Sequence, residues 1–488
     1  VGYCEVGKSA VRGREYLYPQ PFGQITAAAQ KDYPVDFSHF NIMGSATGAY
    51  GIAPDSDAAV FPAVNLEAIL GSSGDLKLRL PVVIPAMGST NIAAKNWDHL
   101  AAGAALAGVG LSIGENVCAM DPRAEIKNGR VVRSPDLERR VEAFRRWYRG
   151  YGFVAVQANV EDTNLGVQEY AIEQLGVEAV ELKWGQGAKN IGGEVKLDSL
   201  ERALQLKSRG YIVLPDPTDP RVQAAYRAGA FKEFERHSRI GMVEEEAFLA
   251  RVEELRRAGA KYVFLKTGAY RPVDLARAVK LASAARLDLL TVDGAGGGTG
   301  MSPWRMMNEW GIPTVYIEVM LGRFLDRLAA KGEYLPPVAI AGGFTLEDQV
   351  FKGLALAAPY VKAVGMSRAP LAAAMVGKTV GTRLQQGKVS NEYKQYGETL
   401  EQVFVLANEV KEMVGDAFAA LPVGAIGVYS YFERLAQGLR QLMCGARKFA
   451  LAYISRDDLA ALTKEAAELS GIPFIMDLDA EEAARILS

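Results

Sequence analysis

Short runs of β-branched and other apolar residues alternate with amphipathic stretches from about Pro81 onward. This alternation is typical of a parallel sheet whose strands are joined by crossover helices. Eight such runs are present, at residues 82–86, 109–113, 153–157, 179–183, 263–267, 289–293, 338–341 and 361–366. Eight strand–helix units predict an α/β fold of the (β/α)8 TIM-barrel class. An open doubly wound sheet is the alternative.

Amphipathic stretches predict three helices between these strands, at residues 136–149, 273–286 and 345–357. The third stretch opens with Thr345 and Asp348, which have the spacing of a capping box. In such a box a hydroxyl and a carboxylate satisfy free backbone N–H groups at the helix start.

Three segments fall outside the strand–helix repeat. Residues 1–80 are loop-rich and are expected to cover one end of the barrel. The barrel itself is expected to span residues 81–390, with an insertion at 215–260 that opens on a proline-rich break. Residues 391–488 are expected to form a helical extension used for packing or subunit association. The helices predicted in it cover residues 431–449, 456–470 and 480–487.

Composition and charge narrow the class of protein. Of 488 residues, 49% are hydrophobic and 23% charged, which excludes a disordered or fibrous chain. The formal net charge is −2 and no long run of like charge occurs, so neither a nucleic acid nor a membrane is an expected partner. Three scattered cysteines and three histidines lack metal-ligand spacing, so no metal site is predicted. Without a signal-like pattern, a cytoplasmic location is expected.

Glycine-rich stretches follow the sixth, seventh and eighth predicted strands, at residues 293–303, 341–344 and 364–368. The active site of a TIM barrel lies at the C-terminal ends of its strands, and phosphate usually binds after strands seven and eight. Consecutive glycines let backbone N–H groups approach an anion. A phosphate-bearing ligand is therefore predicted, with flavin, pyridoxal phosphate and sugar phosphate left open.

A further cluster, at residues 183–193, follows the fourth strand. Lys183, Gln186 and Lys189 place two cations and an amide on a glycine loop, which suits a dianionic, carboxylate-bearing substrate. Lys266 ends the fifth strand and is predicted to point into the barrel. It could act as a Schiff-base lysine or as a cation beside a flavin ring.

Taken in order, these motifs resemble the flavin-binding central domain of glutamate synthases, over about residues 81–388. Residues 183–193 are similar to the family pattern Lys-x-x-Gln-Gly-Ala-Lys-Pro-Gly-x-Gly-Gly. Residues 85–89 resemble Pro-Met-Ser-Phe-Gly, and residues 114–117 stand where the family has Gly-Glu-Gly-Gly. Residues 296–303 resemble Asp-Gly-Gly-Thr-Gly-Ala-Ser-Pro, and residues 342–344 resemble the end of Asp-Gly-Gly-Phe.

The resemblance implies FMN at the barrel mouth and reduction of 2-iminoglutarate, formed from 2-oxoglutarate and ammonia, to L-glutamate. A lysine near the flavin ring would stabilise its anionic reduced form. The implied catalytic residues, which line the substrate pocket, are Glu115, Lys183, Gln186 and Lys189. The implied cofactor-binding residues are Pro85, Ala86, Met87, Gly88, Gln157, Lys266, Asp293, Gly296, Gly297, Gly298, Thr299, Gly342, Gly343, Gly365, Met366 and Ser367.

The chain departs from the family pattern at several places. Residues 372–388 lack the three-cysteine run that holds an iron–sulfur cluster in many members, so no such cluster is expected. No glutaminase-like segment precedes the barrel, so ammonia and electrons are expected from outside, free or from protein partners. Asn190 replaces a proline and Asn116 a glycine, which leaves the keto-acid or amino-acid substrate open.

Two alternatives to glutamate synthesis therefore remain. The first is an FMN enzyme for another amino acid or keto acid, such as an N-methylated glutamate. Hydroxy acids are disfavoured because no histidine lies near the seventh strand. The second is a flavin-carrying electron-transfer subunit. In each case a homo-oligomer or a complex subunit is expected.

Overall fold

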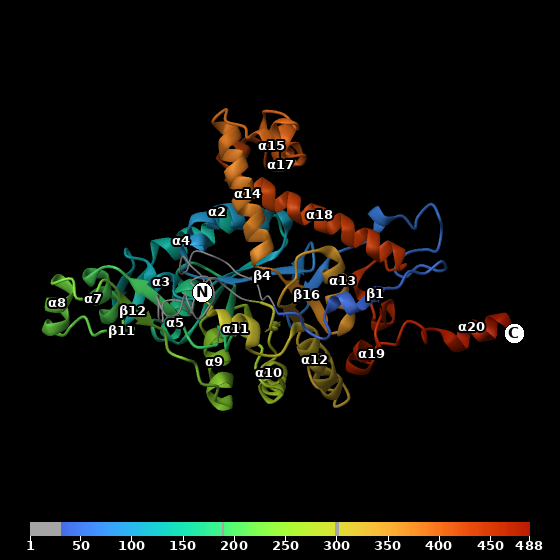
Figure 1. Cartoon of the computed structure of the whole chain (residues 1–488), viewed down its shortest axis with the longest axis horizontal. Coiled ribbons are helices and arrows are strands. Elements are labelled where there is room, and N and C mark those ends of the chain that lie inside the picture. The colour runs from blue at the N-terminus through green and yellow to red at the C-terminus, as the bar shows by residue number, and fades with distance from the viewer. Residues whose placement is uncertain (1–30, 188–189, 298–301) are drawn as a thin grey trace, which may run out of the picture.

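The computed structural model describes residues 31–187, 190–297 and 302–488, and eight parallel strands form a closed barrel at its centre (Figure 1). Around the barrel the strands follow the order β13-β14-β15-β16-β4-β5-β8-β9. The predicted TIM barrel is confirmed, and the open doubly wound sheet is excluded. The eight strands, all predicted, are β4 (Val82–Met87), β5 (Gly110–Ile113), β8 (Phe153–Ala158), β9 (Ala179–Lys183), β13 (Tyr262–Thr267), β14 (Leu289–Asp293), β15 (Val338–Ala341) and β16 (Val361–Gly365).

The interior of the barrel holds its own apolar cluster, separate from the core between strands and helices. Small inward residues such as Ala155 and Ala179 leave room for the rings of Phe153 and Phe264, whose centroids lie 5.1 Å apart. The hairpin of β2 (Ala68–Leu70) and β3 (Leu76–Leu78) adds its leucines to this cluster. The hairpin contacts the loops before β8 and β14, so it closes the N-terminal end of the barrel.

Helices surround the barrel, and the three predicted between strands are confirmed with small shifts at their ends. They are α4 (Pro135–Arg145), α10 (Pro272–Ala284) and α13 (Glu347–Leu356). The capping of α13 differs from the prediction, because Gln349 rather than Asp348 reaches back. Its Oε1 accepts from the backbone N–H groups of Thr345 (2.8 Å) and Leu346 (3.1 Å). The other helices of the barrel layer include α2 (Asn91–Ala107), α6 (Val167–Glu173), α9 (Glu245–Arg257), α12 (Thr314–Ala329) and α14 (Arg368–Gln385).

A small antiparallel sheet lies in the connection between β9 and α9. Its strands are β10 (Glu194–Leu197), β11 (Ile212–Leu214) and β12 (Phe234–His237), in the order β10-β12-β11. Helices α7 (Leu200–Ser208) and α8 (Pro220–Arg227) complete this unit, which lies at one end of the molecule (Figure 1). The domain limits expected from the sequence stay predictions.

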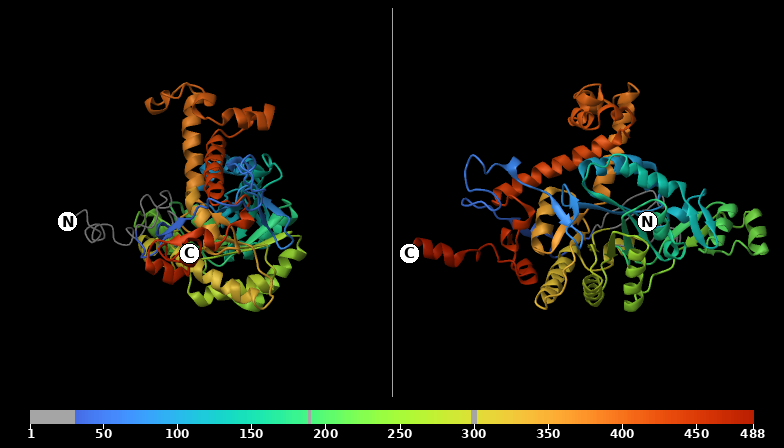
Figure 2. Two further views of the ribbon diagram at one scale, coloured as in Figure 1. Left: turned by 90° about the vertical axis from the view of Figure 1, so that its right-hand side faces the viewer. Right: turned by 180° about the vertical axis from the view of Figure 1, so that it is seen from behind.

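The C-terminal part is mostly helical, with α18 (Gly424–Gly445) packed along α14 and α2 (Figure 1). Glycines permit this close crossing, because a Cβ on Gly103 would lie 2.4 Å from Cβ of Val428. The distal end of α14 and the short helices α15 (Asn391–Lys394), α16 (Leu400–Val403) and α17 (Ala407–Val414) project from the barrel (Figure 2). None of the helices in the described residues is long and apolar enough to cross a bilayer.

The prediction of a helix at residues 456–470 is wrong for the first half of that range. That half forms a 3-10 turn and the strand β17 (Leu459–Ala461), and only α19 (Lys464–Ser470) is helical. β17 pairs antiparallel with β1 (Phe40–Ile42), a partner more than 400 residues away in sequence. A partner so distant overrides the local helical pattern. The last helix, α20 (Ala480–Leu487), matches its prediction.

Candidate active site

Several predicted site residues lie on inward-facing positions at the C-terminal ends of the barrel strands. Along β9 and β13 every second side chain faces inward, so Lys183 follows Ala179 and Lys266 follows Phe264 on the inner face. The register pairs Lys266 with Lys183 across the two strands. Both lysines therefore stand side by side at the mouth of the barrel.

Each of these lysines has an acidic partner. Nζ of Lys183 lies 2.6 Å from Oε2 of Glu115, on the loop after β5, and the two side chains are only 12% and 23% exposed. Nζ of Lys266 lies 3.4 Å from Oδ2 of Asp293, at the end of β14, and both are largely buried. The structure thus brings four predicted residues into two adjacent ion pairs. Their catalytic and cofactor-binding roles stay predictions.

A buried hydrogen bond lies beside these ion pairs, inside the barrel. Nε2 of Gln157, which was predicted, donates to Oε1 of Glu181 at 2.6 Å, and both side chains are buried. Burial raises the pKa of Glu181, while the charge of Lys266 and the Gln157 bond oppose the shift. Glu181 was not predicted. It lies two residues before Lys183 on the same strand, so the inward alternation of β9 was a signal that could have found it.

The loop after β9 is fastened to β13 and to its own end. The backbone N–H of Trp184 donates to O of Lys266 (2.9 Å), and that of Gln186 donates to Oδ1 of Asn190 (2.9 Å). A proline at position 190 would have no side-chain acceptor, so the asparagine in this chain adds a hydrogen bond to the backbone N–H of Gln186. Lys189, predicted beside Gln186, lies outside the described residues.

The loop that carries Glu115 is held by groups which sequence reasoning missed. Asn116 has φ +65°, a left-handed conformation that asparagine adopts more readily than most residues. Its N–H donates to Oδ2 of Asp162 (2.8 Å), and its Oδ1 accepts from the hydroxyl of Tyr211 (2.6 Å). The Arg236 guanidinium lies 4.7 Å from the Tyr211 ring centroid. The sheet between β9 and α9 thereby holds the loop beside the Lys183–Glu115 pair.

Replacing Asp162 with Asn is expected to remove part of the pH dependence of folding stability. Burial raises the pKa of Asp162 from its ordinary value of 3.8 to about 7, so between these values the folded chain binds the proton more strongly than the unfolded chain. The free energy of unfolding therefore falls as pH rises through that window, by up to about 4 kcal/mol from this group.

The measurement is urea unfolding of both proteins at several pH values. The asparagine keeps an oxygen for the Asn116 N–H, so the variant tests charge rather than shape. The free energy of unfolding of the wild type should fall relative to that of Asp162→Asn between about pH 4 and pH 7. Parallel curves would contradict the assignment.

The glycine loop after β15 leaves open space beside Gly343. Gly342 and Gly343 have φ values of +123° and +110°. The hydroxyl of Thr314 donates to the carbonyl O of Gly342 at 2.7 Å and holds that glycine in place. A Cβ on Gly343 would have no atom within 4 Å. On the β16 side, Oγ of Ser367 lies 3.4 Å from O of Pro85. The backbone beside Gly343 is therefore accessible from outside.

The other predicted cofactor-binding residues lie around the same mouth. A Cβ on Gly88 would lie 2.4 Å from O of Glu115, so the end of β4 contacts the Glu115 loop closely. Gly298 and Thr299 lie outside the described residues. The end of β4 consists of Pro85, Ala86 and Met87. The end of β16 is Gly365, and Met366 follows it. The backbone of Gly342 lies against Gly296 and Gly297.

Arg368, which was not predicted, adds a cation on this side. It is the first residue of α14, and its guanidinium donates to O of Gly296 at 3.3 Å. Burial lowers the pKa of Arg368, and the charge of Asp293 opposes that shift. Among the described residues, no three His, Cys, Asp or Glu side chains gather as a metal site requires.

Comparison with known proteins gives one family. Residues 236–378 match the family model described as the conserved region in glutamate synthase. No curated protein matches the chain.

Solved structures with a similar chain path include a flavocytochrome, an oxidase and a dehydrogenase. A flavocytochrome b2 variant with sulfite bound has 13% identity and a TM-score of 0.49, over 87% of this chain and 76% of that chain. A mandelate oxidase variant with the monooxide FMN adduct has 15% identity and a TM-score of 0.46, over 86% and 87%. An (S)-mandelate dehydrogenase chimera has 14% identity and a TM-score of 0.47, over 87% and 88%.

The family match runs from β12 into α14. It contains Lys266, Asp293 and the glycine loops after β15 and β16, whereas Glu115 and Lys183 precede it. Residues 236–378, which include four of the eight barrel strands, thus match the model of this conserved region, and the resemblance inferred from the sequence is confirmed over these residues.

Proposed function

We propose that this chain is an FMN-dependent oxidoreductase that makes L-glutamate from 2-oxoglutarate by way of 2-iminoglutarate. Ammonia and electrons would come from outside the barrel. The observation that carries the proposal is the Lys183–Glu115 ion pair, placed beside Lys266–Asp293 at the mouth of a barrel with a glutamate synthase region. A pure electron carrier has no use for such a carboxylate-binding arrangement.

The residues at the mouth fit FMN. Gly342 and Gly343 would present backbone groups to its phosphate, because the space beside Gly343 is open, and Ser367 follows the neighbouring strand β16. Lys266, nearly buried at the end of β13, would lie by the flavin ring and favour its anionic reduced form. When bound, FMN would supply the hydride that the imine carbon accepts.

The substrate would bind beside Lys183. A carboxylate of 2-oxoglutarate can bond to Nζ of Lys183 and share that cation with Glu115, while Gln186 supplies an amide donor from the adjoining loop. The condensation of keto acid and ammonia releases water, and the imine then gains a hydride on carbon and a proton on nitrogen. Oε2 of Glu115, which accepts from Nζ of Lys183, would also accept from the N–H of the protonated imine.

The direct test is an absorbance titration of the purified protein. The isolated chain should be yellow and release FMN on denaturation, and 2-oxoglutarate should shift the flavin bands. Turnover is then assayed with ammonium and an artificial reductant across a set of keto acids. Flavin bands that do not respond to 2-oxoglutarate would count against glutamate synthesis.

A second candidate is an FMN enzyme that acts on another amino acid or keto acid. The observation in its favour is that Asn116 and Asn190 replace a glycine and a proline of the family pattern, and both side chains are bonded in loops of the pocket. The same titration distinguishes the two, because the true substrate class should shift the flavin bands at the lowest concentration.

Replacing Tyr211 with Phe is expected to weaken substrate binding while the chemical step continues. The change removes the hydroxyl that donates to Asn116 and leaves the ring in place, so the Glu115 loop becomes less fixed. One lost hydrogen bond of about 1 kcal/mol corresponds to a rise in KM of about fivefold. Steady-state kinetics measure KM and kcat, and Tyr226→Phe, in the same sheet unit but bonded to O of Asp198, is the control.

A further inference from the structure

We infer that the C-terminal helix α18 is part of the proposed cofactor site, with Tyr431 as a positioning residue that keeps the loops after β15 and β16 in place for the phosphate. The inference rests on the proposed binding of FMN at these loops. It gives the helical extension a role beyond packing or subunit association. Binding of FMN to the wild type tests that proposal, whereas the response of a Tyr431 variant tests the inference.

Helix α18 lies across the two helices that follow these loops. It packs against α13, which begins after the loop of β15, and against α14, which begins after the loop of β16 (Figure 1). Its own start is fixed to the barrel layer, because the N–H of Gly424 donates to Nδ1 of His99 on α2 at 3.0 Å. One helix therefore bears on both loops from a fixed position.

One face of α18 meets the start of α13. Tyr431, Arg434 and Gly438 recur at intervals of three and four residues, so they lie on the same side of the helix. Arg434 forms an ion pair with Glu347, the first residue of α13. A Cβ on Gly438 would lie 2.7 Å from Cγ of Glu347, so a larger residue would have to displace that side chain. This close approach brings Tyr431 to the loop that precedes α13.

The hydroxyl of Tyr431 contacts both loops. It donates to the carbonyl O of Thr345, two residues after Gly343, at 2.5 Å. It also lies 3.5 Å from Sδ of Met366, the first residue after β16. Burial raises the pKa of Tyr431 to about 12, so the hydroxyl keeps the proton that it donates. A single side chain of the extension thus joins the backbone of one loop to the side chain of the other.

The loop after β15 is held from another side as well. The ring of Phe344 is 5% exposed, and its centroid lies 5.1 Å from that of Phe37, in the segment before the barrel. The carbonyl O of Phe37 accepts in turn from Nζ of Lys352 on α13 at 3.0 Å. With Phe344 and Thr345 both held, Gly343 has a fixed place while it stays exposed. A loop arranged in advance binds its ligand without first having to be ordered.

This arrangement predicts how loss of the hydroxyl should act. Without the bond to Thr345, a smaller fraction of the ligand-free protein has the loop in the binding conformation. The apparent Kd rises by the reciprocal of that fraction. Association should slow by the same factor, whereas dissociation from the ordered complex should change little. A residue that contacted the ligand itself would instead raise the dissociation rate.

Titration of the flavin-free protein with FMN and with riboflavin tests the inference. Tyr431→Phe should raise the Kd of FMN by about fivefold, the equivalent of one hydrogen bond, and slow its association in stopped-flow fluorescence by the same factor. The Kd of riboflavin, which has no phosphate to meet the loops, should stay unchanged. Tyr360→Phe is the matched control, because that hydroxyl donates to Oδ1 of Asp326 at 2.6 Å, before β16 and so at the opposite end of the barrel. It should leave both constants unchanged.

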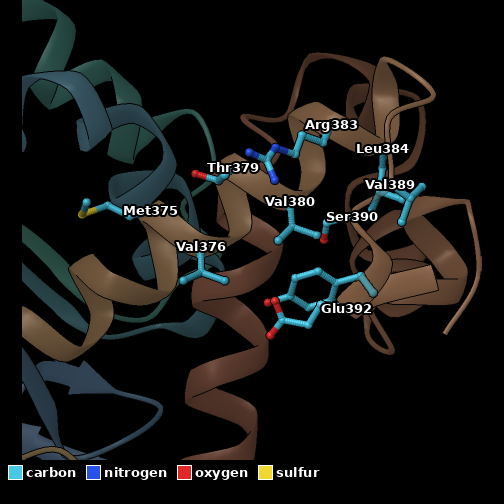
Figure 3. A pocket seen from close by; sticks show the side chains of 10 residues that line it. Met375, Val376, Thr379, Val380, Arg383, Leu384, Val389, Ser390 and Glu392 are labelled. Carbon is cyan, nitrogen blue, oxygen red and sulfur yellow. The ribbon is translucent and has the colours of Figure 1, made fainter. Parts of the chain in front are cut away.

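A second control lies within the C-terminal helices. Val376 is two turns from the start of α14, is 53% exposed and lines a pocket with the segment 389–393 (Figure 3). Val376→Ala changes the surface of α14 without altering a contact of Tyr431, so it should change the binding of neither flavin.

The outcomes separate the inference from the proposal on which it rests. A wild type that binds no FMN would contradict the proposed cofactor and with it the inference. A wild type that binds FMN, together with unchanged affinity of Tyr431→Phe, would overturn the inference alone. Equal losses of affinity for FMN and riboflavin would also overturn it, because they would show a general effect on the barrel mouth. Faster dissociation at an unchanged association rate would overturn the positioning role.

Discussion

Replacing Lys183 with Met is expected to abolish turnover while the protein keeps its FMN. Methionine retains much of the length of the side chain but removes the cation that would bind a substrate carboxylate. It also leaves the carboxylate of Glu115, 2.6 Å from Nζ in the wild type, without this partner and facing an anionic substrate. Lost attraction and added repulsion together predict a fall in kcat/KM of at least about a hundredfold.

Steady-state kinetics and the ratio of flavin to protein absorbance measure this outcome. Lys280→Met is the matched control, because Nζ of Lys280 lies 2.7 Å from Glu245 in an ion pair on the exposed surface. That variant should keep both turnover and flavin. Loss of FMN from Lys183→Met would instead place Lys183 in the cofactor site. Adding Glu115→Gln to Lys183→Met should relieve the repulsion and recover part of the substrate affinity without restoring full turnover.

The barrel could be read from the sequence because each of its strands is buried on both sides. Such strands appear as mostly apolar runs, and all eight were predicted within a few residues. The pairing of β1 with β17 could not be read, because it joins Phe40 to Ala461 and depends on contacts that no local pattern contains. The same contacts hold residues 459–461 as a strand within the segment expected to be helical.

In the candidate site, too, some residues could be predicted from the sequence and others could not. Motifs identified Lys183, Glu115 and Lys266, but only the structure places Lys183 and Glu115 in one ion pair. Tyr211 had no sequence signal, because it is separated from Asn116 by 95 residues and acts through one hydroxyl. Asp162 was missed for a related reason, since its buried position emerges only when the β5 and β8 loops meet. Residues that hold a site in place from distant parts of the chain are thus harder to predict from the sequence than residues within motifs.

Replacing Gly343 with Leu is expected to expel the flavin from an otherwise folded protein. The backbone of Gly343 has φ +110°, and the position of its missing Cβ has no atom within 4 Å. In the proposed holoprotein the cofactor phosphate fills this space, so a leucine side chain would compete with it directly. Strain from the positive φ adds roughly 1–3 kcal/mol of destabilisation that has nothing to do with the ligand.

A matched variant at a second glycine distinguishes the effect of backbone strain from the loss of FMN binding. Gly150 has φ +87° and likewise no atom within 4 Å of a built Cβ, but it lies before β8, at the opposite end of the barrel. Thermal unfolding of the flavin-free proteins should show a comparable loss of stability for Gly150→Leu and Gly343→Leu, whereas the FMN extracted from the proteins as isolated should be missing only from the second. Fluorescence titration of the apoproteins with FMN should show the same difference. If Gly343→Leu retained its full complement of flavin, the phosphate would have to bind somewhere other than the loop after β15.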